Sequence, residues 1–295
     1  MLLDDSPTFS LDTSTPARNV SVINNATGPY TYEVSTPRGV ISTRHVVHAS
    51  NAWAPHLIPG LREYISGIRL HMSAQIGGAG LPEAGHWPDY TGNGSLPTGR
   101  AWTFFNDDLD YAVQMPRTGV YMFGSDVGLR TQYETMDDSE NPDHLTASYL
   151  NGALPNYFGY ESWETERVDD AESVPEGAYP GRSRRVWTGI EGMSGDGFPI
   201  VGHLPASATT RKAENQSLGG EWVISAFNGE GMCSAWLCGR ALSQMISSDQ
   251  ACHVPDWFPT SYLITERRLK NMSGDSRSFV GQSLLKRFHK FVTKW

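Results

Sequence analysis

The residues best suited to hold a ligand form a short glycine turn at 228–231, which reads Asn-Gly-Glu-Gly. The apolar run at 223–227 predicts a buried strand, and the apolar spacing from 232 to 245 predicts an amphipathic helix. Asn228 can cap that helix, while Gly229 and Gly231 allow positive φ and a close approach to the backbone. The free N–H groups of the helix start would face an acceptor-rich group, although the pattern also suits a plain turn between buried elements.

The helix after this turn is expected to bury one apolar face, and Cys233 and Cys238 are expected to pack on the helix as small apolar residues. The face has i, i+3, i+4, i+7 spacing. Its members are Met232, Ala235, Trp236, Cys238, Gly239, Ala241, Leu242 and Met245.

A dinucleotide-binding interpretation of the same turn fails further along the chain. Gly229, Gly231 and Ser234 nearly match G-x-G-x-x-G, and Asp249 lies where an acid for the ribose is expected. Such a unit needs a second parallel strand after the helix, but residues 247–262 are polar and contain two prolines. An NAD-type Rossmann protein built on this turn is therefore the least favoured interpretation.

The composition is typical of a globular, turn-rich protein of one large or two ordinary domains, with 295 residues, 39% hydrophobic, 19% charged, 30 glycines and 18 prolines. No apolar run approaches the roughly 18 residues of a membrane span, and the first ten residues do not resemble a signal peptide. The three cysteines form no disulfide or metal-binding pattern. We expect a soluble, intracellular, cytoplasmic protein without a metal site.

The net charge of −9 is unevenly distributed along the chain. Residues 266–295 carry eight Lys or Arg and two acids, a charge of +6, which leaves −15 for the remainder. Such a basic end is usually solvated and partly ordered. Because Phe288, Phe291 and Trp295 alternate with the charges, a weak contact with a membrane surface or a partner is the alternative. The acidic body gives no support for nucleic-acid binding.

The order of the predicted elements indicates an α/β fold with many strands. Residues 102–105, 111–114 and 120–123 predict an antiparallel meander, and residues 144–154 predict a helix. Further strands are predicted at 30–34 and 40–47, a short helix at 51–57, and long loops at 77–100 and 169–181.

Four segments, in this order, carry a resemblance to a known family. They are VVHASNAWAPHLIPGL (46–61), DYAVQMPRTGVYMFGS (110–125), RVWTGIEGMSGDGFPIVGHLP (185–205) and EWVISAFNGEGMCSAWLCGRAL (221–242). The combination resembles the FAD-dependent oxidoreductases of the D-amino-acid oxidase and sarcosine oxidase superfamily, and is most similar to the fungal members. The likeness covers residues 9–268 and rests on the order and spacing of the segments.

The resemblance implies the C-terminal two thirds of a two-domain flavoenzyme. The family's N-terminal strand, G-x-G-x-x-G turn and helix bind the FAD pyrophosphate, and this chain resembles the family only after that unit, so we expect a truncated protein. The implied fold is α/β, with an incomplete FAD-binding sheet and an antiparallel substrate sheet. The implied parts are a residual FAD-binding part (1–62), a substrate domain (63–185), the flavin-ring segments (186–250) and a basic tail (251–295).

Three segments match cofactor-contacting segments of the family. These are Ala49, Asn51 and Ala52 beside the adenosine; Gly195, Asp196, Gly197 and Pro199 near the flavin ring; and Asn228, Gly229, Glu230, Gly231 and Met232 at the flavin N1 and C2 carbonyl. At the last, a helix start would stabilise the negative charge that builds on the ring as it accepts a hydride. As bare sequence, the Asp-Gly pair also suits a hairpin turn. Gly189 stands where relatives with a covalent flavin carry a cysteine, so any FAD is expected to be non-covalent.

Tyr111 and Gln114 lie on the predicted strand that crosses the substrate pocket in relatives. Alternation places them on opposite faces, so both cannot line one surface, and Gln114 suits a plain strand residue equally well. Glu191 stands where relatives that bind an amino-acid carboxylate have an arginine. It would repel a carboxylate and tolerate an amine or polyol, so a small-molecule amine is the expected substrate.

The implied reaction is hydride transfer from a carbon bearing an amine to the flavin N5, which leaves an imine that hydrolyses. No catalytic residue is assigned, because no histidine has neighbours that mark it as a base. Without its pyrophosphate cradle the chain is expected to be weak or inactive alone, and poorly soluble because a parallel sheet edge is exposed. The alternative is a non-catalytic binding or scaffold protein derived from the same fold.

Overall fold

The computed structural model describes residues 6–23, 28–83, 99–105, 109–125, 135–139, 143–167, 181–211, 219–248 and 253–272. The chain divides into two compact units. Unit 1 comprises residues 1–65 and 192–276, and unit 2 comprises residues 66–191 and 277–295. Unit 1 is therefore assembled from two pieces of chain that are distant in sequence.

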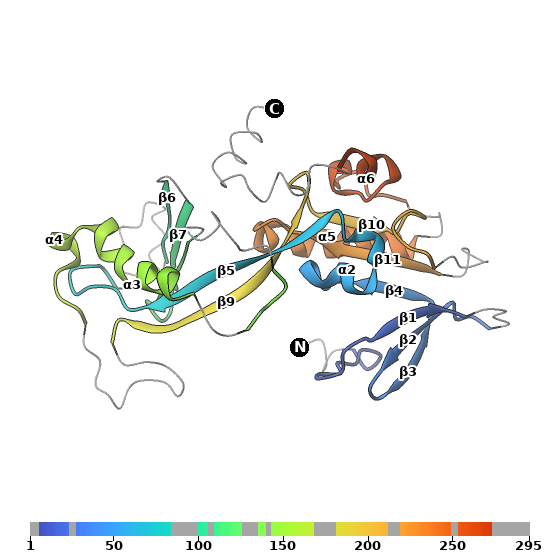
Figure 1. Cartoon of the computed structure of the whole chain (residues 1–295), viewed down its shortest axis with the longest axis horizontal. Helices are drawn as coiled ribbons and strands as arrows, with labels where there is room; N and C mark the ends of the chain where they lie inside the picture. Colours follow the sequence, from blue (N-terminus) through green and yellow to red (C-terminus); the bar gives the residue numbers. More distant parts are fainter. Residues whose placement is uncertain are drawn as a thin grey trace. The chain divides into compact units, whose positions relative to one another are not determined.

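Unit 1 contains a three-stranded sheet of order β10-β11-β4 (Figure 1). β4 (His45–His48) lies parallel to β11 (Gly220–Ser225), and β10 (Ile200–His203) lies antiparallel to β11. α5 (Gly231–Ser247) packs in one core with Val201 and Trp222, and α2 (Ala54–Leu57) packs in another with Ile200 and Val223. Since neighbouring strand residues face opposite sides, the two cores cover the two faces of the sheet.

A buried carboxylate joins β4 to β11. Glu221 is 2% exposed, and its Oε1 lies 2.8 Å from Nε2 of His48. Arg211 donates from Nε to both carboxylate oxygens at 3.1 Å, and Thr209 Oγ1 donates to Oε2 at 3.1 Å. Burial alone would raise the pKa of Glu221, but the bonds from His48 and Arg211 and the charge of Arg211 lower that pKa below its ordinary value. The buried charge is thus paired and hydrogen-bonded, as such charges generally are.

Smaller elements complete unit 1. β1 (Asn19–Val22), β2 (Tyr32–Thr36) and β3 (Gly39–Thr43) form a separate antiparallel sheet. The 3-10 helices are η1 (Asn51–Trp53), η2 (Pro59–Leu61) and η6 (Thr260–Tyr262). α6 (Glu266–Met272) buries Leu269 and Met272 in the core that contains Ile200.

Unit 2 holds a five-stranded sheet of order β6-β7-β8-β5-β9 (Figure 1). β6, β7 and β8 form an antiparallel meander, and β8 also pairs antiparallel with β5. The strands are β5 (Ile65–Gln75), β6 (Ala101–Phe105), β7 (Leu109–Gln114), β8 (Tyr121–Ser125) and β9 (Ser183–Ser194). The chain passes between the two units within β5 and within β9.

Two helices, α3 (His144–Phe158) and α4 (Tyr160–Trp163), cover one face of this sheet. Their core contains Tyr121 and Phe123 from β8 together with Leu150, Leu154 and Trp163. No helix in the described ranges is both long and apolar enough to span a membrane.

Side-chain hydrogen bonds stabilise the start and the interior of α3. Asp143 caps its start by accepting the N–H of Thr146 at 2.8 Å. Pro155 lies inside the helix and lacks the N–H that would bond the carbonyl of Asn151, but that carbonyl accepts a hydrogen bond from Arg182 instead. The helix therefore continues through the proline without an unsatisfied carbonyl.

The structure confirms the mixed α/β class and most predicted elements. β6, β7 and β8 are the expected meander, α3 is the helix expected at 144–154 in a longer form, and η1 and α2 form the expected short helical turn. The boundaries between the two units fall at 65/66 and 191/192, where the sequence predicted 62/63 and 185/186. The FAD-binding and substrate-binding roles expected for these parts of the chain stay predictions. Most of the loop expected at 169–181, the middle of the loop expected at 77–100, Cys252 and the tail after 272 lie outside the described residues.

Two expectations about the C-terminal third are wrong. Met232 and Trp236 are 100% and 86% exposed, and Cys233 is exposed too, because α5 packs on the sheet through Cys238, Ala241, Leu242 and Met245. Asn228 does not cap α5, since Glu230 occupies the N-cap position and makes no side-chain bond there. Residues 266–272 are the described part of the basic end; they form α6, and Leu269 and Met272 contribute to the core.

His71 on β5 makes the stability of unit 2 depend on pH. Its Nε2 accepts the N–H of Asp143 at 2.9 Å, which requires a neutral ring. Burial and the charge of Arg69 lower the pKa of His71 below its ordinary 6.5, against an opposite effect of Asp143. The unfolded chain therefore binds a proton at a higher pH than the folded chain, so stability falls as the pH drops below 6.5 and is constant above it.

We predict that His71→Gln, whose amide oxygen can still accept from Asp143, removes this contribution to the pH dependence. Urea unfolding across the mildly acidic range would show a flatter profile for the variant than for the wild type. His56→Gln is the control, because His56 is exposed. The same acid slope in His71→Gln and the wild type would contradict the assignment.

The outer side of α5 is an apolar surface formed by Met232, Trp236 and Leu237, which are 100%, 86% and 47% exposed. Exposed apolar patches and open strand edges promote association.

We predict that the chain alone self-associates and that the double variant Met232→Glu/Trp236→Glu strongly reduces light scattering. Its free energy of unfolding should change by only about 0.5 kcal/mol, because both side chains are exposed. Leu145→Glu on α3, at a residue 82% exposed, is the matched control and should leave scattering unchanged. Scattering equal to the wild type in the double variant would exclude this surface as the cause.

Candidate functional site

Three segments of unit 1 meet where β4 and β11 end. Asn51 lies just after β4, and its Oδ1 accepts the N–H of Ala226 at 2.9 Å and that of Phe227 at 3.4 Å. The backbone carbonyl of Asn51 also accepts the hydroxyl of Ser225 at 2.7 Å. Asn51 therefore ties the turn after β4 to the turn after β11, and we call this meeting point the junction.

Asn228 bonds the third segment, which is the end of β9 and the turn after it. Its N–H donates to the carbonyl of Gly192 at 3.0 Å, and its Oδ1 accepts the N–H of Ser194 at 2.9 Å. The hydroxyl of Ser194 in turn donates to the carbonyl of Phe198 at 2.8 Å. A Cβ added at Gly192 would lie 2.7 Å from Oδ1 of Asn51, so glycine lets the segments approach this closely.

The backbone of the junction is strained. Five non-glycine residues in the described ranges have positive φ, and Asn51, Ala226 and Asn228 of the junction are three of them. The left-handed conformation costs an alanine about 1–2 kcal/mol. Gly197 and Gly229, with φ of 81° and 90°, adopt it without that cost. Strain of this kind tends to concentrate at functional sites.

α5 begins at the junction without a side-chain cap. The N–H groups of Gly231, Met232 and Cys233 have no intrahelical acceptor, as is true of the first N–H groups of any helix, and no side-chain cap binds them. Gly229, Glu230 and Met232 are exposed, so the positive end of this 17-residue helix is open to an acceptor group. Of the other predicted cofactor residues, Ala49 is exposed, Ala52, Gly195 and Pro199 are buried, and Asp196 and Gly197 are half-buried.

Asp196 pairs with Arg268 of α6, a residue that sequence analysis counted in the basic end. Nε and Nη2 of Arg268 lie 2.8 Å and 2.9 Å from the two carboxylate oxygens. The side chain of Arg268 is 10% exposed. Asp196 also accepts the N–H of Phe198 at 3.2 Å, a local bond typical of an Asp-Gly turn.

Sequence reasoning missed Ser194 and Arg268 for different reasons. Ser194 directly precedes Gly-Asp-Gly, and a serine beside such a turn often bonds the local backbone, so a signal was present. Arg268 is 72 positions from Asp196, and no local pattern connects them.

Unit 2 carries the three residues predicted to face substrate. On β7, Gln114 is 2% exposed and lies with Ala112 on the face covered by α3, whereas Tyr111 lies on the other face, as alternation predicts. Tyr111 lies against β8, because a Cβ added at Gly124 would be 2.6 Å from the tyrosine hydroxyl. Glu191 lies on β9 and is half-buried.

The buried and half-buried histidines of the described ranges bond or pack within the fold. His48 bonds Glu221 and His71 bonds Asp143, while Nδ1 of His45 accepts the N–H of Gly220 at 3.1 Å. Burial lowers the pKa of both His45 and His203. No group of three or more His, Cys, Asp or Glu suited to a metal ion occurs among the residues that the structure describes.

We predict that Asn51→Ala destabilises unit 1 by about 2–4 kcal/mol, because it strands two N–H groups and places alanine in a left-handed conformation. Asn51→Asp keeps an acceptor and tolerates that backbone, so it should cost less than half as much. Urea unfolding with amide exchange at Ala226 and Phe227 measures both effects. Equal losses in the two variants would show that the side-chain acceptor does not hold the junction.

Comparison with known proteins adds independent findings. The family described as FAD dependent oxidoreductase (DAO) matches residues 14–245. L-proline dehydrogenase from P. horikoshii has a similar structure, with a TM-score of 0.54 and 15% identity over 91% of this chain and 55% of that chain. Glycine oxidase from Geobacillus kaustophilus has a TM-score of 0.54 and 16% identity over 85% of this chain and 52% of that chain. No curated protein matches the sequence.

At these identities the structural likeness shows the fold, and this chain spans about half the length of the solved structures it matches. The family match, in contrast, covers most of the chain and includes all three segments of the junction. The chain therefore belongs to the DAO family of FAD-dependent oxidoreductases.

Proposed function

We propose that the chain is part of an oxidoreductase that oxidises an amine, and that the junction holds the flavin ring of a non-covalent FAD. The observation that carries the proposal is the convergence of three distant segments, joined by the side chains of Asn51, Ser194 and Asn228. Family membership supplies FAD as the cofactor class.

The residues of the junction fit a flat, acceptor-rich group. The open N–H groups at the start of α5 can donate to ring nitrogen and carbonyl acceptors. Gly195, Gly197 and Gly229 carry no side chain that would keep a ring away from the backbone. Ala49 and Ala52 flank Asn51 on the side assigned to the adenosine.

FAD, when bound, supplies the hydride acceptor. The chain itself contributes position and electrostatics. The start of α5 places positive partial charge where negative charge would build on the ring, and that dipole needs no reorganisation during the reaction. Asn51 and Asn228 hold the strained backbone that presents it.

The proposed substrate is an amine that lacks a carboxylate. Glu191 would attract a protonated amine and repel a carboxylate, in the place where carboxylate-binding relatives have an arginine. Tyr111 adds an aromatic face on β7. Gln114 remains the weaker candidate, because its side chain lies on the face that α3 covers and donates to the carbonyl of Pro82 at 3.2 Å.

We further infer that the chain is a part of a longer, fungal-type flavoenzyme whose pyrophosphate cradle lies outside these 295 residues. The half-length match to solved structures supports this inference. The position of β4 also supports it, because among the described residues β4 pairs only with β11 and its other edge could pair with a further strand. Such a part alone would bind FAD weakly and have little activity.

A binding or scaffold role is the second candidate. The exposed surface of Met232, Trp236 and Leu237 favours it, because contiguous exposed apolar residues often mark binding sites. The part of the basic tail that suggested a partner contact, with Phe288, Phe291 and Trp295, lies outside the described residues.

Titration of the purified chain with FAD, followed by flavin fluorescence, tests the cofactor assignment. We predict saturable binding that Gly231→Val weakens by about tenfold, because the added side chain would crowd the ring. The fold should tolerate the change, since a Cβ at Gly231 meets Phe227 only at 3.6 Å. Gly239→Val, on the same helix with open space around it, is the control. A wild type that binds no FAD would reject the assignment and favour the scaffold role.

The FAD-loaded enzyme tests the substrate assignment. We predict faster turnover of amines than of the matching amino acids, and a shift of the ratio toward amino acids by at least about tenfold in Glu191→Arg. Glu161→Arg, at an exposed position of α4, should leave the ratio unchanged. An unchanged ratio in Glu191→Arg would remove Glu191 from the substrate site.

A further inference from the structure

Arg268 uses its whole guanidinium group to bind one turn and the segment that precedes α6. Nε donates to Oδ2 of Asp196 at 2.8 Å, and Nη2 donates to Oδ1 of Asp196 at 2.9 Å and to the carbonyl of Phe198 at 2.8 Å. Nη1 donates to the carbonyl of Pro199 at 2.9 Å and to that of Tyr262 at 2.8 Å. All five N–H groups thus have acceptors, and most of these acceptors lie in the turn at 194–199.

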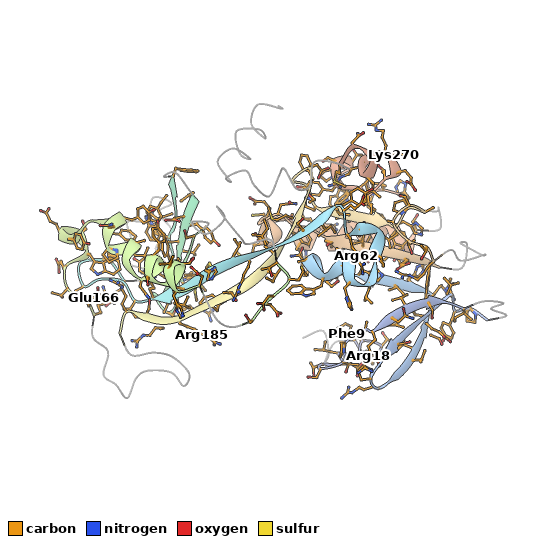
Figure 2. All side chains as sticks on the ribbon, in the orientation of Figure 1. Phe9, Arg18, Arg62, Glu166, Arg185 and Lys270 are labelled. Atoms are coloured by element: carbon orange, nitrogen blue, oxygen red, sulfur yellow. The ribbon has the colours of Figure 1, made fainter. Side chains whose placement is uncertain are left out.

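This arrangement needs an arginine. Its planar fork meets the Asp196 carboxylate with two parallel hydrogen bonds, and a lysine would supply one point charge without that geometry. The side chain is 10% exposed, so water competes little for these bonds. Neighbouring residues of α6 differ, because Arg267 is exposed and Lys270, labelled in Figure 2, is exposed as well.

The turn connects Arg268 to the junction. The hydroxyl of Ser194 donates to the carbonyl of Phe198, which Arg268 also binds, and the N–H of Ser194 donates to Oδ1 of Asn228 at 2.9 Å. Asn228 lies in the turn from which α5 starts. The hydrogen bonds are therefore continuous from α6 through the Gly-Asp-Gly turn to the helix start assigned to the flavin.

We propose that Arg268 is a positioning residue of the cofactor site, which fixes the turn at 194–199 from a helix that lies beyond the family match at 14–245. It touches neither flavin nor substrate. It acts by holding the backbone of Gly195 and Gly197 in the shape that faces the ring. The role toward the flavin rests on the function proposed above, whereas the hold on the turn does not.

Amide exchange in the chain without FAD tests the hold on the turn. Arg268→Met should raise the exchange rates of the Gly197 and Phe198 amides by about tenfold. The reason is that the turn loses the hydrogen bonds from Arg268 to its carboxylate and carbonyls. Arg268→Lys should give an intermediate increase, and Arg267→Met should give none. Asp196→Asn removes the negative charge that Arg268 binds but keeps a neutral acceptor, and it should raise the exchange rates of the same amides. This variant provides the test if Arg268→Met does not fold. Unchanged exchange in folded Arg268→Met, or in Asp196→Asn if Arg268→Met does not fold, would overturn the proposal.

FAD titration of the same variants tests the role toward the flavin. With a wild type that binds FAD, Arg268→Lys and Asp196→Asn should bind more weakly and shift the visible flavin absorbance, and Arg267→Met should match the wild type. Identical affinity and spectra would overturn the positioning role. A wild type that binds no FAD rejects the proposed function instead, and the exchange rates alone then decide whether Arg268 holds the turn.

Discussion

The parallel pairing of β4 with β11 is the contact on which the rest of unit 1 depends. It joins residues 45–48 to residues 220–223, two pieces of chain separated by all of β5 to β10. Glu221 fixes the pair, because its carboxylate is buried and bonds His48 of β4 as well as Arg211. A buried charge is stable only with its partners in place, so the carboxylate favours this one arrangement of the two strands.

Parallel strands end at the same edge of a sheet, and this brings the junction together. Asn51 follows β4 and Asn228 follows β11, so both amide side chains reach the same place and bond backbone groups there. Ligand sites of α/β sheets commonly lie at the carboxyl ends of strands for this geometric reason. The strained backbones of Ala226 and Asn228 persist because these hydrogen bonds and the packing of β11 offset their cost.

Sequence predicted what is local and missed what depends on distant partners. Alternation identified β7 and placed Tyr111 and Gln114 on opposite faces, and helical spacing identified α3. The same spacing could not tell which apolar stripe of α5 would be buried, because the choice depends on the sheet beneath it. Three cofactor segments were named from a resemblance in order and spacing, but their meeting depends on strand pairing. The bond between Arg268 and Asp196 had no local signal at all.

The exposed side of α5 and the edge of β4 have one physical origin. Val47 pairs with Trp222 and faces the same side, yet it is 44% exposed, because α5 packs over Val201 of β10 and Trp222 of β11. Parallel strands are stable when helices cover both faces, and here the described helix layer ends before β4. A strand beside β4 with a helix beside α5 would cover Val47, Met232 and Trp236 together. The longer flavoenzyme proposed above would supply such a neighbour, which would account for the exposed tryptophan and for the edge of β4 that has no strand partner among the described residues.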